Sequence, residues 1–294
     1  LFNKSKFTID KKEILKFVGY LTLGTLSIVF FSYIDTIMLG LFVSAENIGY
    51  YKAAFTLVLG VSGLLSFVNI LMPVLAKVSA SGLSTVFNKV IKYSMILTLP
   101  ATFGIIALAK YLIRLVYGYD YLQATIFIYI LSPLVVISVT MGIFLTLFSA
   151  RAKPEKFAKL TLAGALLNII LNYLFIIYFI KISEFQATIG VAIATVISWT
   201  IYFFASFLLI NKELKIEIKW LNIIRPLFAS IVMFLIINFL ILRITDVTLF
   251  IGIFVVFFGI LFYTFVLWLI RGLNHEDFAL IRGLFNYLPF YNNL

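Results

Sequence analysis

The chain has 294 residues, of which 63% are hydrophobic and only 12% are charged, and its formal net charge is +11. Soluble domains are about half apolar and about one quarter charged, so this composition exceeds what a water-soluble core can bury. The chain has no cysteine and a single histidine, His275, which excludes disulfides and Cys-ligated zinc and argues against any transition-metal site. We therefore expect an integral membrane protein without cofactor or metal. The basic residues lie in clusters between apolar runs, so we expect no nucleic-acid partner.

Eight apolar runs reach the roughly 20 residues that an α-helix needs to cross a bilayer. They are Phe17–Val43, Gly49–Ala76, Ile91–Ile113, Ala124–Ser149, Leu160–Ile180, Ile189–Ile210, Ile224–Leu242 and Thr248–Ile270. In lipid, backbone amides must be paired within a helix or a closed barrel, and these continuous runs differ from the alternating short strands of a barrel. The sequence therefore predicts an all-α, polytopic membrane bundle of about eight transmembrane helices.

The lysines and arginines predict the orientation of these helices. With eight spans, 18 of the 23 basic residues fall on one side of the membrane and five on the other. The five basic residues on the second side are Lys52, Lys110, Arg114, Lys181 and Arg243. Cytoplasmic loops carry an excess of Lys and Arg, so we predict a multi-pass protein of the cell membrane with both termini in the cytoplasm.

Asp35 is the charged residue that lies deepest in a predicted span. It precedes Val43 by eight residues, which is about 12 Å along a helix. A carboxylate at this depth is costly unless it faces the protein interior or a water-filled cavity. Gly24, Ser27, Ser32 and Asp35 fall within an arc of roughly 140°, so one face of this helix is small and polar. Asp35 is a candidate for ion coupling or the substrate path, and the structural alternative is an ion pair with Lys52.

Asparagines mark two further spans. Asn168 and Asn172 lie four residues apart on the fifth span, in one stripe with Thr161 and Gly164. Such amides join helices across a seam or line a polar cavity, and both readings remain open here. Asn69 lies in the second span. We take Asp35, Lys52, Asn69, Asn168 and Asn172 as candidates for the substrate path or ion coupling, and we expect no catalytic residue.

Small residues and prolines indicate how the helices pack and bend. Gly190, Ala194 and Ser198 form a ladder of small residues on the sixth span, which predicts close helix packing without chemistry. Pro100 and Pro133 fall within the third and fourth spans, where a proline removes a hydrogen bond and permits a bend.

Two stretches resemble a known family. The segment from Tyr33-Ile-Asp-Thr-Ile-Met-Leu-Gly to Phe55 is similar to the one that opens a lobe in polysaccharide flippases. The run from Ala150-Arg-Ala-Lys-Pro through Asn168-Ile-Ile-Leu-Asn172 to Ser198 also looks like the family pattern, although Arg151-Ala152 replaces its usual Leu-Gly. The chain thus resembles the polysaccharide biosynthesis branch of the multidrug/oligosaccharidyl-lipid/polysaccharide exporter superfamily.

The resemblance implies an organisation in lobes. Members of this family usually have two six-helix lobes followed by two extra helices, and the chain resembles the second lobe with that extra pair. We expect a cytoplasmic segment (1–16), a six-helix lobe (17–210), two additional helices (211–270) and a cytoplasmic amphipathic tail (271–294). The resemblance implies that a first lobe is missing and is required. A lone lobe is then expected to leave Asp35, Asn168 and Asn172 on an open face.

The function implied by the resemblance is transport. The expected activity is flipping of a lipid-linked oligosaccharide or polysaccharide precursor across the cytoplasmic membrane by alternating access, with the lipid-linked sugar and membrane lipid as partners. One alternative is a cation-coupled exporter of drugs or other small molecules from the same superfamily, which an ion site at Asp35 would favour. A membrane enzyme of polysaccharide assembly is the second alternative.

Overall fold

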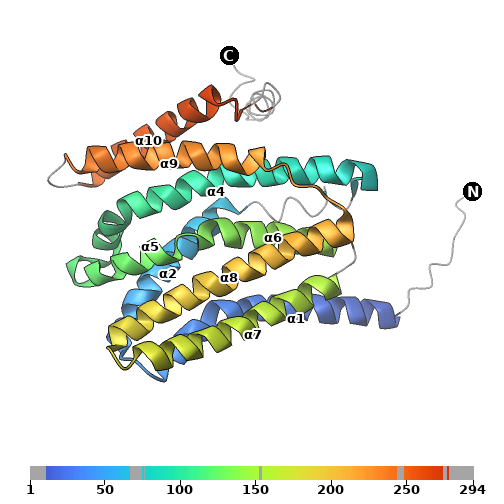
Figure 1. Ribbon diagram of the computed structural model, residues 1–294, viewed down its shortest axis with the longest axis horizontal. Coiled ribbons are helices and arrows are strands. Elements are labelled where there is room, and N and C mark those ends of the chain that lie inside the picture. The colour runs from blue at the N-terminus through green and yellow to red at the C-terminus, as the bar shows by residue number, and fades with distance from the viewer. Residues whose placement is uncertain are drawn as a thin grey trace, which may run out of the picture.

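The computed structural model describes residues 11–66, 75, 77–151, 154–243, 248–273 and 277, and every regular element in these residues is helical (Figure 1). The α-helices are α1 (Lys11–Gly40), α2 (Ala45–Leu65), α4 (Ala80–Tyr117), α5 (Thr125–Leu131), α6 (Leu134–Ala150), α7 (Pro154–Phe179), α8 (Glu184–Leu214), α9 (Leu221–Ile241) and α10 (Leu249–Leu269), with a 3-10 helix, η1 (Tyr119–Ala124), before α5. The prediction of an all-α bundle is confirmed. Asn69 and most of the predicted tail lie outside the described residues.

The predicted number of spans agrees with the helices. Six helices of the described chain are long and apolar enough to cross a membrane singly, and the total rises to eight if each of two bent pairs forms one span. The second pair, Tyr119–Leu131 with Leu134–Ala150, is bent by 50°. Pro133 stands at this break, where its missing N–H interrupts the helical ladder. Pro100, in contrast, lies inside the continuous helix α4.

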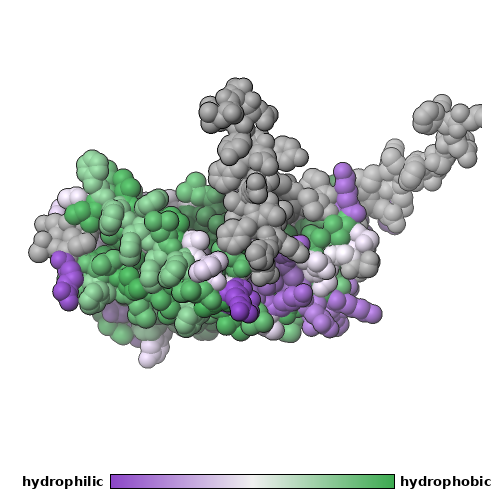
Figure 2. Space-filling model, turned by 90° about the horizontal axis from the view of Figure 1, so that it is seen from above, coloured by the Kyte–Doolittle hydropathy of each residue, from purple (hydrophilic) through white to green (hydrophobic). Residues whose placement is uncertain are grey.

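The helices run back and forth between two ends of the bundle. The α7–α8 turn lies at the left end of the view in Figure 1, and the start of α7 and the end of α8 lie at the right. In the visible face of Figure 2, hydrophilic residues gather mainly at the right-hand end, and hydrophobic surface covers most of the remainder. A broad hydrophobic surface on this face suits contact with the hydrocarbon of a bilayer.

The orientation of this bundle remains a prediction, which reporter fusions can test. We expect fusions after Ser79, Arg151 and Lys219 to report a cytoplasmic location, because these sites lie on the side that holds 18 of the 23 basic residues. Fusions after Asn47 and Asp120 should report an external location. A fluorescent protein that matures only in the cytoplasm and a phosphatase active only outside serve as complementary readouts. Reversal at two or more sites would contradict the topology.

Two hydrophobic clusters hold the helices together. The larger cluster contains buried residues of α1, α2 and α4 through α8, with aromatic side chains such as Phe31, Phe127 and Phe144. The smaller one joins α4, α9 and α10 around Leu108, Met233 and Tyr263. Helix α4 contributes buried side chains to both clusters. The pair α9–α10 therefore packs on the rest of the bundle chiefly through α4.

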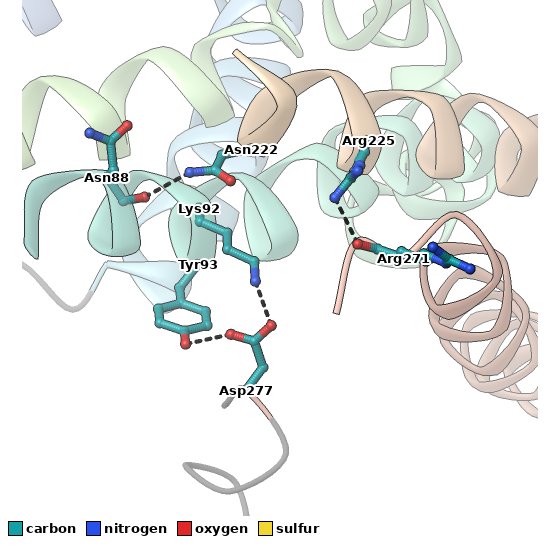
Figure 3. Close-up of polar contacts among 7 residues, drawn as sticks. All are labelled: Asn88, Lys92, Tyr93, Asn222, Arg225, Arg271 and Asp277. Carbon is teal, nitrogen blue, oxygen red and sulfur yellow. Dashed lines mark hydrogen bonds and ion pairs between the residues drawn. The ribbon is translucent and has the colours of Figure 1, made fainter. Parts of the chain in front are cut away.

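Asn88 on α4 also binds the connection between α8 and α9. Its side-chain amide donates to the carbonyl of Glu217 at 2.8 Å, and its side-chain oxygen accepts from the backbone N–H of Lys219 at 2.8 Å. The Asn222 side chain donates to the Asn88 carbonyl at 3.3 Å (Figure 3). One asparagine thus satisfies backbone groups of an irregular segment, which fixes where α9 begins.

Polar contacts also attach the segment after α10. Figure 3 shows Asp277 between Lys92 and Tyr93, both on α4. The Asp277 carboxylate forms an ion pair with Lys92 and accepts a hydrogen bond of 2.7 Å from the Tyr93 hydroxyl. Arg225 on α9 donates to the carbonyl of Arg271 at 2.8 Å. These contacts fasten the end of α10 and the residue beyond it to the same end of α4 and α9.

Candidate functional site

The Asp35 carboxylate is fully buried among four helices. Oδ2 accepts hydrogen bonds from the Tyr51 hydroxyl of α2 at 2.5 Å and from the Thr195 hydroxyl of α8 at 2.9 Å. Oδ1 accepts from the side-chain amide of Asn172 on α7 at 2.6 Å. The prediction that Asp35 faces the protein interior is confirmed, since its exposed fraction is 0%.

Lys52 does not pair with Asp35. Its ammonium lies over two aromatic rings, 5.2 Å from the centre of the Tyr33 ring and 5.5 Å from that of Phe55. The structural alternative of an Asp35–Lys52 ion pair is therefore wrong. The reason is helical geometry, because consecutive residues on a helix point about 100° apart. Tyr51 directs its hydroxyl inward, and the adjacent Lys52 side chain consequently leaves the interior.

The two asparagines of α7 extend the polar contacts of Asp35. Asn172 donates to the Asn168 side-chain oxygen at 3.3 Å in addition to Asp35. Asn168 in turn donates to the hydroxyls of Ser198 at 3.0 Å and Thr195 at 3.5 Å. We call Asp35, Tyr51, Asn168, Asn172, Thr195 and Ser198 the Asp35 cluster; all six residues are buried with exposed fractions of 0%.

Small residues bring these helices close enough for such contacts. A Cβ atom on Gly190 of α8 would lie 2.8 Å from Phe179, so α7 and α8 touch through glycine. Between α1 and α7, a Cβ on Gly164 would lie 3.0 Å from Phe31, and one on Gly24 would lie 3.6 Å from Ala158. The predicted packing ladder on α8 is confirmed. Its member Ser198, assigned to packing alone, also accepts a hydrogen bond in the cluster.

The Asp35 cluster lacks a positive charge. Among the described residues no basic side chain forms an ion pair with Asp35, and its partners are a phenol, an amide and a hydroxyl. Burying an ionised carboxylate without a counter-charge costs several kcal/mol, even when it is hydrogen-bonded. Asp35 thus stays a candidate for ion coupling, because an ionisable residue at membrane depth is costly unless it serves a function.

Several oxygen atoms take part in the Asp35 cluster, and the groups that contact the carboxylate itself donate hydrogen bonds to it. Side-chain oxygens of Asp35, Asn168, Asn172 and Thr195 meet within this network, and the Asn172 oxygen is buried without a hydrogen-bond partner. Hard cations prefer carboxylate, amide and hydroxyl oxygens over nitrogen or sulfur. The described residues contain no group of three or more His, Cys, Asp or Glu side chains that could hold a metal ion.

Three members of this cluster were not site candidates in the sequence: Tyr51 and Thr195 were missed, and Ser198 was assigned to packing. Tyr51 shares a buried face of α2 with Ala54, Phe55 and Val58, a helical spacing that was visible in the sequence. The expectation that a lone lobe leaves its polar residues on an open face is also wrong. Within this chain, helices α1, α2, α7 and α8 enclose Asp35, Asn168 and Asn172, and hydrogen bonds join the three side chains.

The sequence matches proteins of glycan assembly. A family model described as "Polysaccharide biosynthesis protein" matches residues 4–126. The chain is 25% identical to the "Probable low-salt glycan biosynthesis flippase Agl15" of Haloferax volcanii, and this match covers 96% of the chain and 57% of the relative. The chain therefore spans less than two thirds of the length of this curated relative.

The fold matches solved membrane transporters. The lipid II flippase MurJ in an inward closed conformation gives a TM-score of 0.65 at 18% identity, covering 82% of this chain and 51% of MurJ. A MOP superfamily transporter from Pyrococcus furiosus and a multidrug resistance MATE family transporter each give 0.55 at 16% identity, covering 76% of this chain and 52% of theirs. The names of these proteins describe flippases and transporters. The chain is thus similar in sequence to polysaccharide and glycan biosynthesis proteins and similar in fold to transporters of the MOP superfamily.

Proposed function

We propose that the chain is the second lobe, with its extra helix pair, of a flippase that moves a lipid-linked oligosaccharide or polysaccharide precursor across the cell membrane. The observation that carries this proposal is the match along 96% of the chain to a glycan biosynthesis flippase. The fold supports it, because a MurJ-like arrangement of bendable spans suits alternating access between two bundles.

The proposed role of the Asp35 cluster is ion coupling. Uptake of a proton or a monovalent cation would neutralise Asp35, and it would change the hydrogen bonds that join α1, α2, α7 and α8. A ligand shifts a conformational equilibrium only through its different affinity for the two states. A carboxylate shared by four helices meets this condition, since any relative movement of the helices alters its coordination. Lys52 and Asn69 remain candidates for the substrate path.

A first lobe is the partner that this proposal requires. Alternating access rocks two lobes around a central site, and the chain covers only 57% of the Agl15 relative and 51% of MurJ. We expect the 294-residue chain alone to show no translocation of a fluorescent lipid-linked oligosaccharide in liposomes. The same assay on the chain joined to a first lobe should show translocation. A purified monomer of the single chain that moves the lipid would overturn this part of the proposal.

A cation-coupled exporter of small molecules is the second candidate. The buried Asp35 cluster and the likeness in fold to a multidrug resistance MATE family transporter favour it. The two candidates differ in substrate, so the same liposomes can separate them. Movement of a lipid-linked sugar without efflux of cationic dyes supports the flippase. Dye efflux driven by a proton or sodium gradient, without movement of the glycolipid, supports the exporter.

A further inference from the structure

A groove of about 510 Å³ lies between α7 and α8, at the end of the bundle where α7 begins and α8 ends. Its polar end is formed by Lys156, Lys159 and Lys212, and Ala163 and Ala205 line it further along the two helices. The alanines create the hollow, because each presents only a methyl group between larger aliphatic neighbours. Leu208, which also lines the groove, is 72% exposed.

The outer faces of both helices continue as apolar surface. Leu166 and Ile170 on α7 are 53% and 56% exposed, and Ile201 and Phe204 on α8 are 49% and 55% exposed. Side chains of this kind are stable in contact with hydrocarbon and not with water. The groove therefore opens toward the lipid phase along its length, while its lysines lie at the predicted cytoplasmic interface.

The polar end of the groove has an excess of positive charge. Lys156 pairs with Glu213 at 2.5 Å, and Lys159 pairs with Glu155 at 2.8 Å. Lys16 also approaches Glu155, at 3.8 Å. Lys212 is exposed and has no ion-pair partner in the described part of the chain.

These charges leave room for an anion. Among the described residues, the three lysines of the groove and Lys16 surround Glu155 and Glu213, which gives a net charge of +2. A phosphate at this position would meet an unpaired ammonium on Lys212 and two further lysines within reach of it.

The spacing along α7 matches the dimensions of a phospholipid. Lys156 and Ala163 are seven residues apart, which is about 10 Å along a helix. The polar layer on each side of a bilayer is about 5–8 Å deep, so lysines at phosphate level place the alanines in the hydrocarbon. We propose that the groove is a binding site for an anionic phospholipid of the surrounding membrane, with the phosphate at the three lysines and one acyl chain over the two alanines.

This proposal does not depend on transport, and lipid binding can test it directly. The purified, delipidated chain is titrated with phosphatidylglycerol and with phosphatidylcholine of identical acyl chains, and bound lipid is counted by native mass spectrometry. We expect about tenfold tighter binding of phosphatidylglycerol. K156Q/K159Q/K212Q should lose this preference. The matched control K77Q/K215Q/K219Q removes three lysines of the same predicted interface that do not line the groove, and it should keep the preference.

A second variant separates the groove from general electrostatic attraction. A163L/A205L fills the groove without changing any charge, and the exposed position of Ala163 makes the change compatible with folding. We expect it to weaken phosphatidylglycerol binding at least about fivefold. Unchanged binding in A163L/A205L, or an equal loss in the control variant, would overturn the proposal. Preferential retention of a polyprenyl diphosphate over phosphatidylglycerol would overturn the assignment to a membrane phospholipid.

Discussion

Asp35→Asn should reduce the transport rate of the assembled transporter by at least about tenfold, a loss of roughly 1.4 kcal/mol in the rate-limiting step. The amide keeps the size of the side chain and can still accept hydrogen bonds from Tyr51 and Thr195. It cannot take up a proton or balance the charge of a cation. The amount of folded protein should therefore remain within about a factor of two of wild type, since no buried charge is left unpaired.

The measurement is the initial rate of lipid-linked sugar movement per folded molecule, in liposomes with and without an imposed proton or sodium gradient. Asp120→Asn provides the control, because Asp120 lies in the exposed 3-10 helix η1. In the wild type the gradient should accelerate transport, and in Asp35→Asn this acceleration should vanish. An Asp35→Asn protein with a normal rate and a normal response to the gradient would refute a coupling role.

Asn172→Leu is expected to have the largest effect on stability, lowering the free energy of unfolding by about 3 kcal/mol. The leucine removes the 2.6 Å hydrogen bond to Asp35 and leaves a buried carboxylate with two donors instead of three. The variant should unfold at a clearly lower temperature in detergent, followed by tryptophan fluorescence or by aggregation. Asn238→Leu is the matched control, since Asn238 on α9 donates only to the carbonyl of Phe234 in its own helix.

A double variant tests whether the loss arises at Asp35. Asp35→Leu combined with Asn172→Leu removes the carboxylate together with its donor, so the buried charge no longer exists. Replacing both members of a buried polar contact costs less than removing one of them. We expect the double variant to be more stable than Asn172→Leu alone. If the double variant loses the sum of the free energies of unfolding that Asp35→Leu and Asn172→Leu lose singly, the contact between these residues does not hold the four helices together.

The helices could be predicted from the sequence because in lipid each apolar run must satisfy its own backbone hydrogen bonds. Their ends were harder to predict. Helix α4 starts at Ala80, where the Ser79 side chain caps it, 11 residues before the apolar run at Ile91. Polar residues continue a helix into the aqueous interface at little cost, so hydropathy does not mark the end of the helix. Pro133 breaks a span and Pro100 does not, and the sequence offers no signal that separates the two prolines.

The site was predicted in part. The sequence identified Asp35, Asn168 and Asn172 because a polar side chain within an apolar run is costly in lipid unless it faces the protein interior or a cavity. Their partners Tyr51 and Thr195 were missed because periodicity within one helix does not reveal the rotation and height of the next helix. The Asp35–Lys52 ion pair was one of two interpretations of Asp35, and it is wrong because the Lys52 side chain points toward Tyr33 instead.

Helix α4 has a mechanical consequence for any rocking motion of this bundle. It spans 38 residues and contributes to both hydrophobic clusters, and its first turns bind the start of α9 and Asp277. Tightly packed interfaces do not deform continuously, so α9 and α10 cannot slide on α4 without opening the smaller cluster. Helices α9 and α10 should then move together with the bundle as one rigid body. The movement of α9 and α10 through the bilayer would enlarge the membrane area that the protein displaces in each rocking step. Lipid viscosity and bilayer thickness would then influence the rate of the rocking motion.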